Sequence, residues 1–261
     1  MECIKYLNSY DEVSTLISTI QKRRMFDNSF LEHYRGQGRP EYKLVPTIAR
    51  SVKTGKEIQE KESSLIEALQ SKLKMHNLEK NLRVDKCLNE KENLWNILIQ
   101  SQHLGIPTRF LDWSLKWEIG LWFAVENPAN DNIDGQFWIF SVPNEIHLTD
   151  TYYKEDITNL DQTYFINAPI YWSNELEEYI GEIKRQRQQG KFTVSPYNNA
   201  VIPLEEQAEM TQFLEKYCIP ASIKGQIRLE LTSKGIHEEW LYYRENNNAA
   251  LNDIIKSINK E

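Results

Sequence analysis

The chain has 261 residues, 40% of them hydrophobic and 11% aromatic, which is enough apolar surface for a substantial core. Its formal net charge of −7 and its pI near 5.4 argue against non-specific binding to the phosphate backbone of nucleic acids. We therefore expect a globular protein for which nucleic acid is not the expected partner.

The cysteines and the N-terminus bear on the cellular compartment. Cys3, Cys87 and Cys218 are far apart and odd in number, so we expect neither a disulfide framework nor a thiolate metal site. The N-terminus lacks the basic-then-apolar layout of a signal peptide, and no window is apolar for long enough to cross a bilayer. These features predict a cytoplasmic protein without membrane contact.

Hydrophobic periodicity in the first hundred residues predicts helices around one early strand. The strand ends in a turn at Gly36 and Gly38, which places Arg35 at its end. Pro46 is predicted at a turn or a first helical position, with Arg50 one helical turn further on. The predicted elements are helices over 11–23, 57–77 and 90–101, a strand over 30–35 and a polar connection over 79–89.

The stretch 102–124 contains the densest group of residues with restricted positions. Gln102 and His103 end the preceding helix, and Gly105 and Pro107 break it. A short run over 109–111 follows, and 112–114 is predicted to open an aromatic-rich helix that continues to residue 125. Loops of this kind between two apolar elements often carry functional residues, so we predict one here.

The second half of the chain mixes strands and helices. A tight turn at Asp134 and Gly135 predicts the start of a strand with apolar residues on both faces. Lys234 and Gly235 are typical of a helix C-terminus. The predicted elements are strands over 136–142, 191–194 and 216–219, helices over 174–184, 205–215, 222–235, 238–244 and 249–258, and a Tyr-rich loop over 144–172.

We find no linker that would divide the chain. The sequence therefore predicts one domain over 1–261 of the α+β class, with a mixed or antiparallel β core and helical decoration. Its core is expected over about 30–236, with an N-terminal helix over 11–24 and C-terminal helices over 237–258 packed on it.

Several chemistries lack support. Ser101 and Ser114 have no GxSxG context, and Cys87 has no nearby histidine. No Walker loop and no GxGxxG sequence is present. The histidines lack the spacing of a metal site, so no metal is expected; they are His33, His76, His103, His147 and His237.

The remaining polar candidates suit a phosphorylated ligand better than an amide-bond substrate. Arginines at strand ends can make bidentate contacts with phosphate, and amides or hydroxyls can orient a ribose. Structural roles are equally open, because Asp112 or Ser114 could cap the second helix and Arg109 could pair with Asp112. The candidates are Arg35, Arg50, Gln102, His103, Thr108, Arg109, Asp112, Gln188 and Gln189.

Several motifs resemble the FRG domain family, named for its Phe/Tyr-Arg-Gly motif. They are YRGQ at 34–37, QHLGIPTRFLDWS at 102–114 running into LWFA, DGQFWIF at 134–140, RQRQQGKFTV at 185–194, and IPASIKGQIRLELTSKGI at 219–236. The sequence departs from the family pattern at Ser114, where Thr is usual, and at Gly120, where Ala is usual. The resemblance implies a bacterial protein, with a role as a toxin or phage-defence effector.

The order of these motifs is more distantly similar to the ADP-ribosyltransferase superfamily. That similarity implies an ADP-ribosyltransferase-like β core and NAD as a substrate. Mapped by motif, it gives Arg35 the NAD phosphate or ribose, Ser114 the nicotinamide-ribose pocket, and Gln188 or Gln189 the ribose and acceptor hydroxyls. If a neutral Gln replaces the usual Glu, then Asp112, Glu178 or Glu182 could supply the negative charge.

Three functions follow for testing. The first is an NAD-using transferase or glycohydrolase, with His103 as a further catalytic candidate and Gln37 as a further cofactor-binding candidate. The second is a non-catalytic FRG module that binds a phosphorylated ligand or a protein partner. The third and weakest is nucleic-acid binding through the basic cluster of Lys184, Arg185, Arg187 and Lys191.

Overall fold

The structure is a computed structural model that describes residues 5–24, 30–77, 89–148, 154–166, 188–242 and 249–259. Its α-helices are α1 (Tyr10–Arg24), α2 (Gly55–Met75), α3 (Glu90–His103), α4 (Trp117–Val125), α6 (Tyr197–Ala200), α7 (Ala208–Thr211), α8 (Ala221–Ser233), α9 (Glu238–Leu241) and α10 (Ala249–Ile258). Its strands are β1 (Phe30–Gln37), β2 (Phe110–Ser114), β3 (Gly135–Pro143), β4 (His147–Leu148), β5 (Tyr164–Ile166), β6 (Gly190–Val194) and β7 (Leu214–Ile219). Short 3₁₀ helices are η1 (Thr47–Ser51), η3 (Pro128–Asn130), η4 (Asn144–Ile146) and η7 (Leu204–Glu206).

The described strands form one seven-stranded sheet in the order β4-β5-β6-β2-β1-β3-β7. Neighbouring strands are antiparallel except β4 and β5, which are parallel. The expected α+β class with a mixed β core is therefore confirmed.

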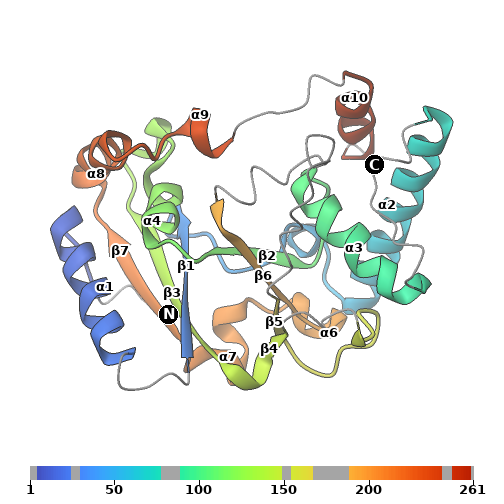
Figure 1. The fold of residues 1–261 in the computed structure, drawn as a ribbon, viewed down its shortest axis with the longest axis horizontal. Coiled ribbons are helices and arrows are strands. Elements are labelled where there is room, and N and C mark those ends of the chain that lie inside the picture. The colour runs from blue at the N-terminus through green and yellow to red at the C-terminus, as the bar shows by residue number, and fades with distance from the viewer. Residues whose placement is uncertain are drawn as a thin grey trace, which may run out of the picture.

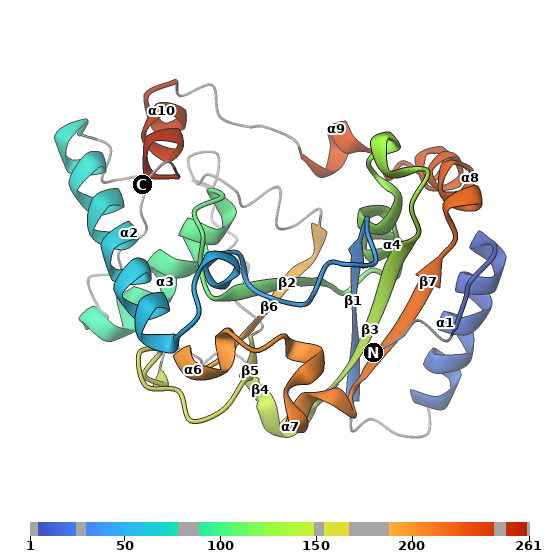
Figure 2. The same cartoon turned by 180° about the vertical axis from the view of Figure 1, so that it is seen from behind.

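The sheet can be divided into one group of strands, β1, β3 and β7, and a second group, β2, β6, β5 and β4. In Figure 1, β1, β3 and β7 run together, whereas β2 runs across the direction of β1. Helices α1, α4 and α8 lie with the first group, and α2, α3 and α10 lie on the other side of the molecule, as the reverse view in Figure 2 also shows.

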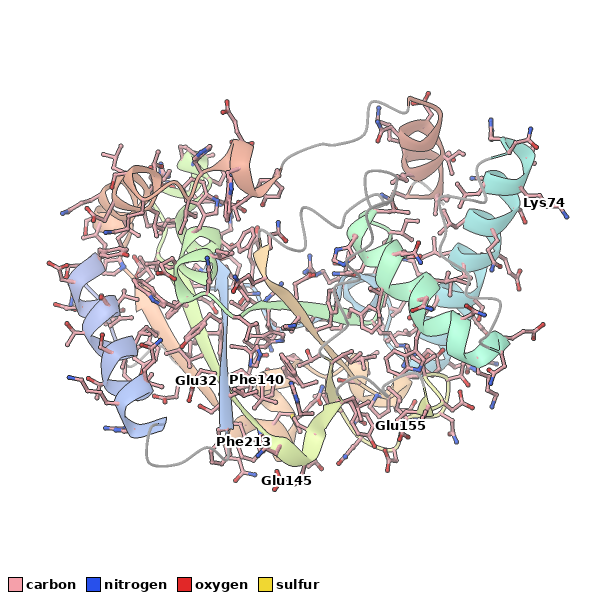
Figure 3. All side chains as sticks on the ribbon, in the orientation of Figure 1. Glu32, Lys74, Phe140, Glu145, Glu155 and Phe213 are labelled. Atoms are coloured by element: carbon pink, nitrogen blue, oxygen red, sulfur yellow. The ribbon has the colours of Figure 1, made fainter. Side chains whose placement is uncertain are left out.

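A different apolar cluster stabilises each of these two sides of the molecule. Helices α1, α4 and α8 pack on β1, β3 and β7 around Ile119 and Phe137, while Leu69 of α2 packs with Ile254 of α10. In Figure 3, fully buried Phe140 lies in the interior, whereas Lys74 points outward from α2.

Most predicted elements are present close to their expected limits. The helices expected over 11–23, 57–77, 90–101 and 249–258 correspond to α1, α2, α3 and α10, and the strand expected over 136–142 corresponds to β3. The connection over 79–89 falls almost entirely outside the described residues, and the helix over 174–184 falls entirely outside them.

Three predictions about the elements are wrong. In the loop expected over 144–172, the described residues include η4, β4 and β5. Residues 112–114 belong to β2 and do not open the next helix, which begins at Trp117. The helix expected over 205–215 is replaced by η7, α7 and the first residues of β7. For β2 and β7, the partner strand, β6 or β3, supplies backbone hydrogen bonds that the local pattern did not reveal.

Helix α4 packs directly on the backbone of β1. A Cβ atom at Gly36 would lie 2.1 Å from the carbonyl oxygen of Gly120, and one at Gly120 would lie 2.7 Å from Cβ of Tyr34. Side chains at either position would push the helix off the strand. The two glycines therefore set how closely α4 approaches the strand that carries Arg35.

One expectation about cysteine is corrected. Cys218 in β7 is disulfide-bonded. Cysteine usage therefore no longer supports a reducing compartment. Among the described helices, none has the length and apolar composition that crossing a membrane requires.

We expect Gly36→Ala to lower the free energy of unfolding by about 1–3 kcal/mol or more, because the new methyl group meets backbone atoms that cannot move aside. Urea denaturation measures the change. Gly225→Ala in α8 is the control: outside the helix backbone, the nearest atom to the new methyl group is Oδ2 of Asp131 at 4.0 Å, so the substitution should stabilise the helix by about 0.5–1 kcal/mol. Equal effects at the two positions would contradict the close packing.

Candidate functional site

The site lies where β1 and β2 diverge. Within the described residues, the only register pair between these strands joins Tyr34 to Ser114, whereas β1 pairs with β3 along its whole length. A cavity of about 720 Å³ opens beside this divergence. The lining includes Arg35, Gln37, Tyr42, Arg50, Gln102, His103, Asp112, Ser114, Glu126, Gln188 and Tyr242.

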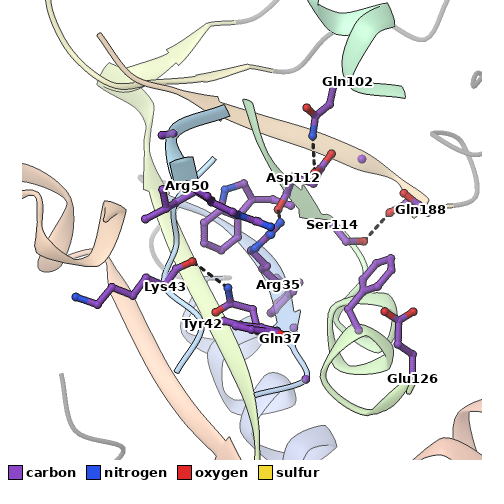
Figure 4. A pocket seen from close by; sticks show the side chains of 18 of the residues that line it. Arg35, Gln37, Tyr42, Lys43, Arg50, Gln102, Asp112, Ser114, Glu126 and Gln188 are labelled. Atoms are coloured by element: carbon purple, nitrogen blue, oxygen red, sulfur yellow. Dashed lines mark hydrogen bonds between the residues drawn. The ribbon is translucent and has the colours of Figure 1, made fainter. Parts of the chain in front are cut away.

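Arg35 spans the divergence. Its Nη1 donates to the backbone carbonyl oxygen of Asp112 at 2.6 Å (Figure 4). In the described part of the chain, no group accepts a hydrogen bond from its Nε. Burial lowers the pKa of Arg35 and the charge of Arg50 lowers it further, whereas the charge of Asp112 raises it. An anion bound in the cavity would offset both unfavourable effects.

Arg50 comes from η1 and faces the same cavity as Arg35 (Figure 4). It is exposed, and its Nε donates to the carbonyl oxygen of Val45 at 3.3 Å. Two guanidinium groups from different elements thus meet at one cavity. Such a pair is suited to a phosphate or pyrophosphate group, which accepts hydrogen bonds from several planar donors at once.

A chain of side-chain hydrogen bonds holds the opposite wall. Thr108 donates from Oγ1 to Oε1 of Gln102 at 2.6 Å, and Nε2 of Gln102 donates to Oδ2 of Asp112 at 2.7 Å. Gln102 and Asp112 line the cavity as expected. Thr108 is 1% exposed and does not line the cavity. Its hydroxyl instead holds the Gln102 side chain in position.

Ser114 ties β2 to the residue before β6. Its hydroxyl donates to the carbonyl oxygen of Gln188 at 2.7 Å and accepts from the backbone N–H of Lys116 at 3.1 Å. The hydroxyl lies in the cavity wall but is engaged in these structural bonds. This geometry favours a positioning role for Ser114 over the contact with the nicotinamide ribose that the resemblance implies.

Gln188 and Gln189 differ in their position relative to the cavity. Gln188 lines the cavity, and its Nε2 donates to the carbonyl oxygen of Leu241 at 3.3 Å. Gln189 has a φ of 46° in the turn before β6 and is absent from the lining. Gln188 is therefore the better candidate. The acidic alternatives Glu178 and Glu182 lie outside the described residues.

Gln37 and His103 both line the cavity. The Gln37 amide is engaged at both ends, because Nε2 donates to the carbonyl oxygen of Lys43 and Oε1 accepts from the indole of Trp138. His103 ends α3 as predicted, and its ring meets Phe192 edge-on at 5.5 Å between centroids. Both residues therefore belong to the cavity wall. Hydrogen bonds fix the amide of Gln37, and His103 is half-buried.

Arg109, which the sequence proposed as a ligand-binding residue, is held in the interior. It is 2% exposed and is not part of the cavity lining. Its Nε donates to both carboxylate oxygens of Glu62 at 3.1 and 3.0 Å, and its Nη1 and Nη2 donate to the carbonyl oxygens of Ser195 and Ile157. Its partner is therefore Glu62 and not Asp112.

Glu126 and Tyr242 are among the cavity residues that the sequence analysis missed. Glu126 follows α4, and its Oε2 accepts a hydrogen bond from the hydroxyl of Tyr242 at 2.7 Å. Burial, followed by the charge of Glu126, raises the pKa of Tyr242. Glu126 lies just after the stretch 102–124, and Tyr242 lies after the last motif, so no local pattern marked either residue.

Among the described residues, no three His, Cys, Asp or Glu side chains are grouped as a metal would require. Of the basic cluster suggested for nucleic acid, Lys191 is 8% exposed and so presents little charge to solvent, while residues 184, 185 and 187 lie outside the described part.

The fold and site define an α+β protein with a cavity at a divergence in its sheet, where Arg35 and Arg50 meet. The model of the FRG domain matches residues 32–133, from β1 to just before β3, so the FRG resemblance is confirmed for this part of the chain. The matched range carries Arg35, Arg50 and the stretch 102–124. Neither the curated proteins nor the solved structures gave a match to the chain.

We expect Arg109→Met to lower the free energy of unfolding by about 3–5 kcal/mol, because it leaves the carboxylate of Glu62 buried without its partner. Arg50→Met, which removes an exposed guanidinium, should change it by less than about 0.5 kcal/mol. Urea denaturation of the two variants distinguishes them. Wild-type stability of Arg109→Met would contradict the structural role of the pair.

Proposed function

We propose that this protein binds NAD in the cavity between β1 and β2 and consumes it, as an ADP-ribosyltransferase-like or NAD glycohydrolase-like enzyme. The observation that carries the proposal is the meeting of Arg35 and Arg50 at a cavity of about 720 Å³. That volume is within the range of small-molecule and cofactor sites. The two guanidinium groups would bind the pyrophosphate.

In the reaction, the bond between the nicotinamide nitrogen and the ribose carbon breaks, and its electron pair leaves with nicotinamide. Water or an acceptor nucleophile then bonds to that carbon and loses a proton. Positive charge builds on the ribose before the new bond forms, so a nearby carboxylate stabilises the transition state. Asp112 and Glu126 are carboxylates in the cavity lining that could supply this charge.

A second candidate is a module that binds the phosphorylated ligand without turnover. Specific contacts favour it, because the hydroxyl of Ser114 and the amide of Gln37 are engaged in structural hydrogen bonds. Both candidates need the arginine pair. They differ in whether nicotinamide is released.

Purified protein is incubated with NAD while nicotinamide release is followed, and NAD affinity is measured by calorimetry. We expect release by the wild type. Arg35→Gln should weaken NAD binding about 10–150-fold, because it removes a charge-assisted hydrogen-bond donor from the cavity. Arg23→Gln, which removes an exposed arginine of α1, is the matched control and should bind NAD like the wild type.

Thermal melting of each variant separates a loss of binding from a loss of folding, since Arg35 also bridges β1 and β2. NAD binding without nicotinamide release would favour the non-catalytic module. Absence of both binding and release in a folded wild type would overturn the proposal.

A further inference from the structure

A buried lysine holds residues 38–43, the first part of the connection between β1 and η1. Lys224 of α8 is 0% exposed, and its Nζ donates to the carbonyl oxygens of Gly38 at 3.1 Å, Asn130 at 2.7 Å and Ile133 at 3.1 Å. Three carbonyl acceptors require three N–H donors, which only the protonated amine has. The ammonium group therefore binds the start of the loop to η3 and the turn before β3.

Two glutamines hold the rest of the loop. Nε2 of Gln136, which is 0% exposed, donates to the carbonyl oxygens of Arg39 at 2.9 Å and Tyr42 at 3.3 Å. Nε2 of Gln37 donates to the carbonyl oxygen of Lys43 at 3.1 Å. Buried donors thus satisfy carbonyl groups along the loop, so its backbone is preorganised.

This rigid loop presents an exposed aromatic ring. Tyr42 lines the cavity yet is 49% exposed, whereas Tyr34, which also lines it, is 3% exposed. Figure 4 shows Tyr42 beside Gln37, on the side of the cavity where Arg35 and Arg50 lie. The apolar side chains of Val45, Ala49 and Val201 add to the lining. Covering the Tyr42 ring with a planar group would remove apolar surface from water without reordering the loop.

We propose that Tyr42 is the stacking platform for the nucleobase of a nucleotide whose phosphate groups bind Arg35 and Arg50. The inference rests on the proposed function, since it takes the bound ligand to be a nucleotide. It assigns a binding residue to the nucleobase, the part of the ligand that the arginines would not contact. The nucleobase would lie on the ring of Tyr42, and the phosphates joined to it would bind Arg35 and Arg50 in the same cavity.

The test compares ADP with inorganic pyrophosphate by isothermal titration calorimetry. The wild type should bind ADP more tightly than pyrophosphate. Tyr42→Ala should weaken ADP binding about 5–150-fold, the range that loss of base stacking on an aromatic side chain gives. It should leave pyrophosphate binding unchanged, because pyrophosphate has no ring to stack.

Two further variants make the comparison specific. Tyr42→Phe keeps the ring and should retain the ADP preference. Tyr6→Ala removes a ring that is 53% exposed but outside the cavity lining, so it should bind both ligands like the wild type. Thermal melting checks that each variant is folded.

Each outcome separates the two proposals. If the wild type binds ADP no more tightly than pyrophosphate, or if Tyr42→Ala weakens both equally, the stacking role is overturned while NAD consumption can still stand. If ADP binding depends on Tyr42 but NAD is neither bound nor cleaved, the stacking role stands and the proposed function fails. If neither ADP nor pyrophosphate binds the folded wild type, the stacking role is overturned, and the NAD experiment alone decides the proposed function.

Discussion

The structure depends on how β1 and β2 separate after the pair formed by Tyr34 and Ser114. A continuous antiparallel ladder would satisfy the carbonyl oxygen of Asp112 with a backbone N–H of the neighbouring strand. Here the guanidinium of Arg35 takes that place at 2.6 Å. One side chain therefore joins the two groups of strands, and the space that a ladder would fill becomes the cavity.

Rigid contacts on both sides make this arrangement possible. On one side, the absence of side chains at Gly36 and Gly120 lets α4 lie against the backbone of β1, close to Arg35. On the other side, the buried pair of Arg109 and Glu62 binds the start of β2 to α2. The cavity thus lies between two walls that are each fixed by buried contacts, which favours a site whose geometry exists before the ligand arrives.

The polar residues around the cavity divide by what their atoms already bind. Ser114, Gln37 and Thr108 use their hydroxyl or amide groups within the wall. Arg50 and Tyr42 instead present exposed groups to the cavity. This division explains why the site suits an anionic ligand with a planar ring. In the NAD proposal, the phosphates therefore bind the arginines, and Asp112 or Glu126 supplies the catalytic carboxylate.

The amino-acid sequence determined the long helices, the strand β3 and the motifs that mark the FRG range, because these depend on local periodicity and residue type. It could not reveal that FLDWS at 110–114 is a strand, since five residues are too few for a clear period and the partner β6 lies about eighty residues on. Nor could it separate Arg109 from Arg50. The two side chains have the same chemistry, and only packing decides that Arg109 meets Glu62 in the interior while Arg50 faces the cavity. Charge pairing between distant residues is set by the tertiary structure, so the function of each arginine was decided there.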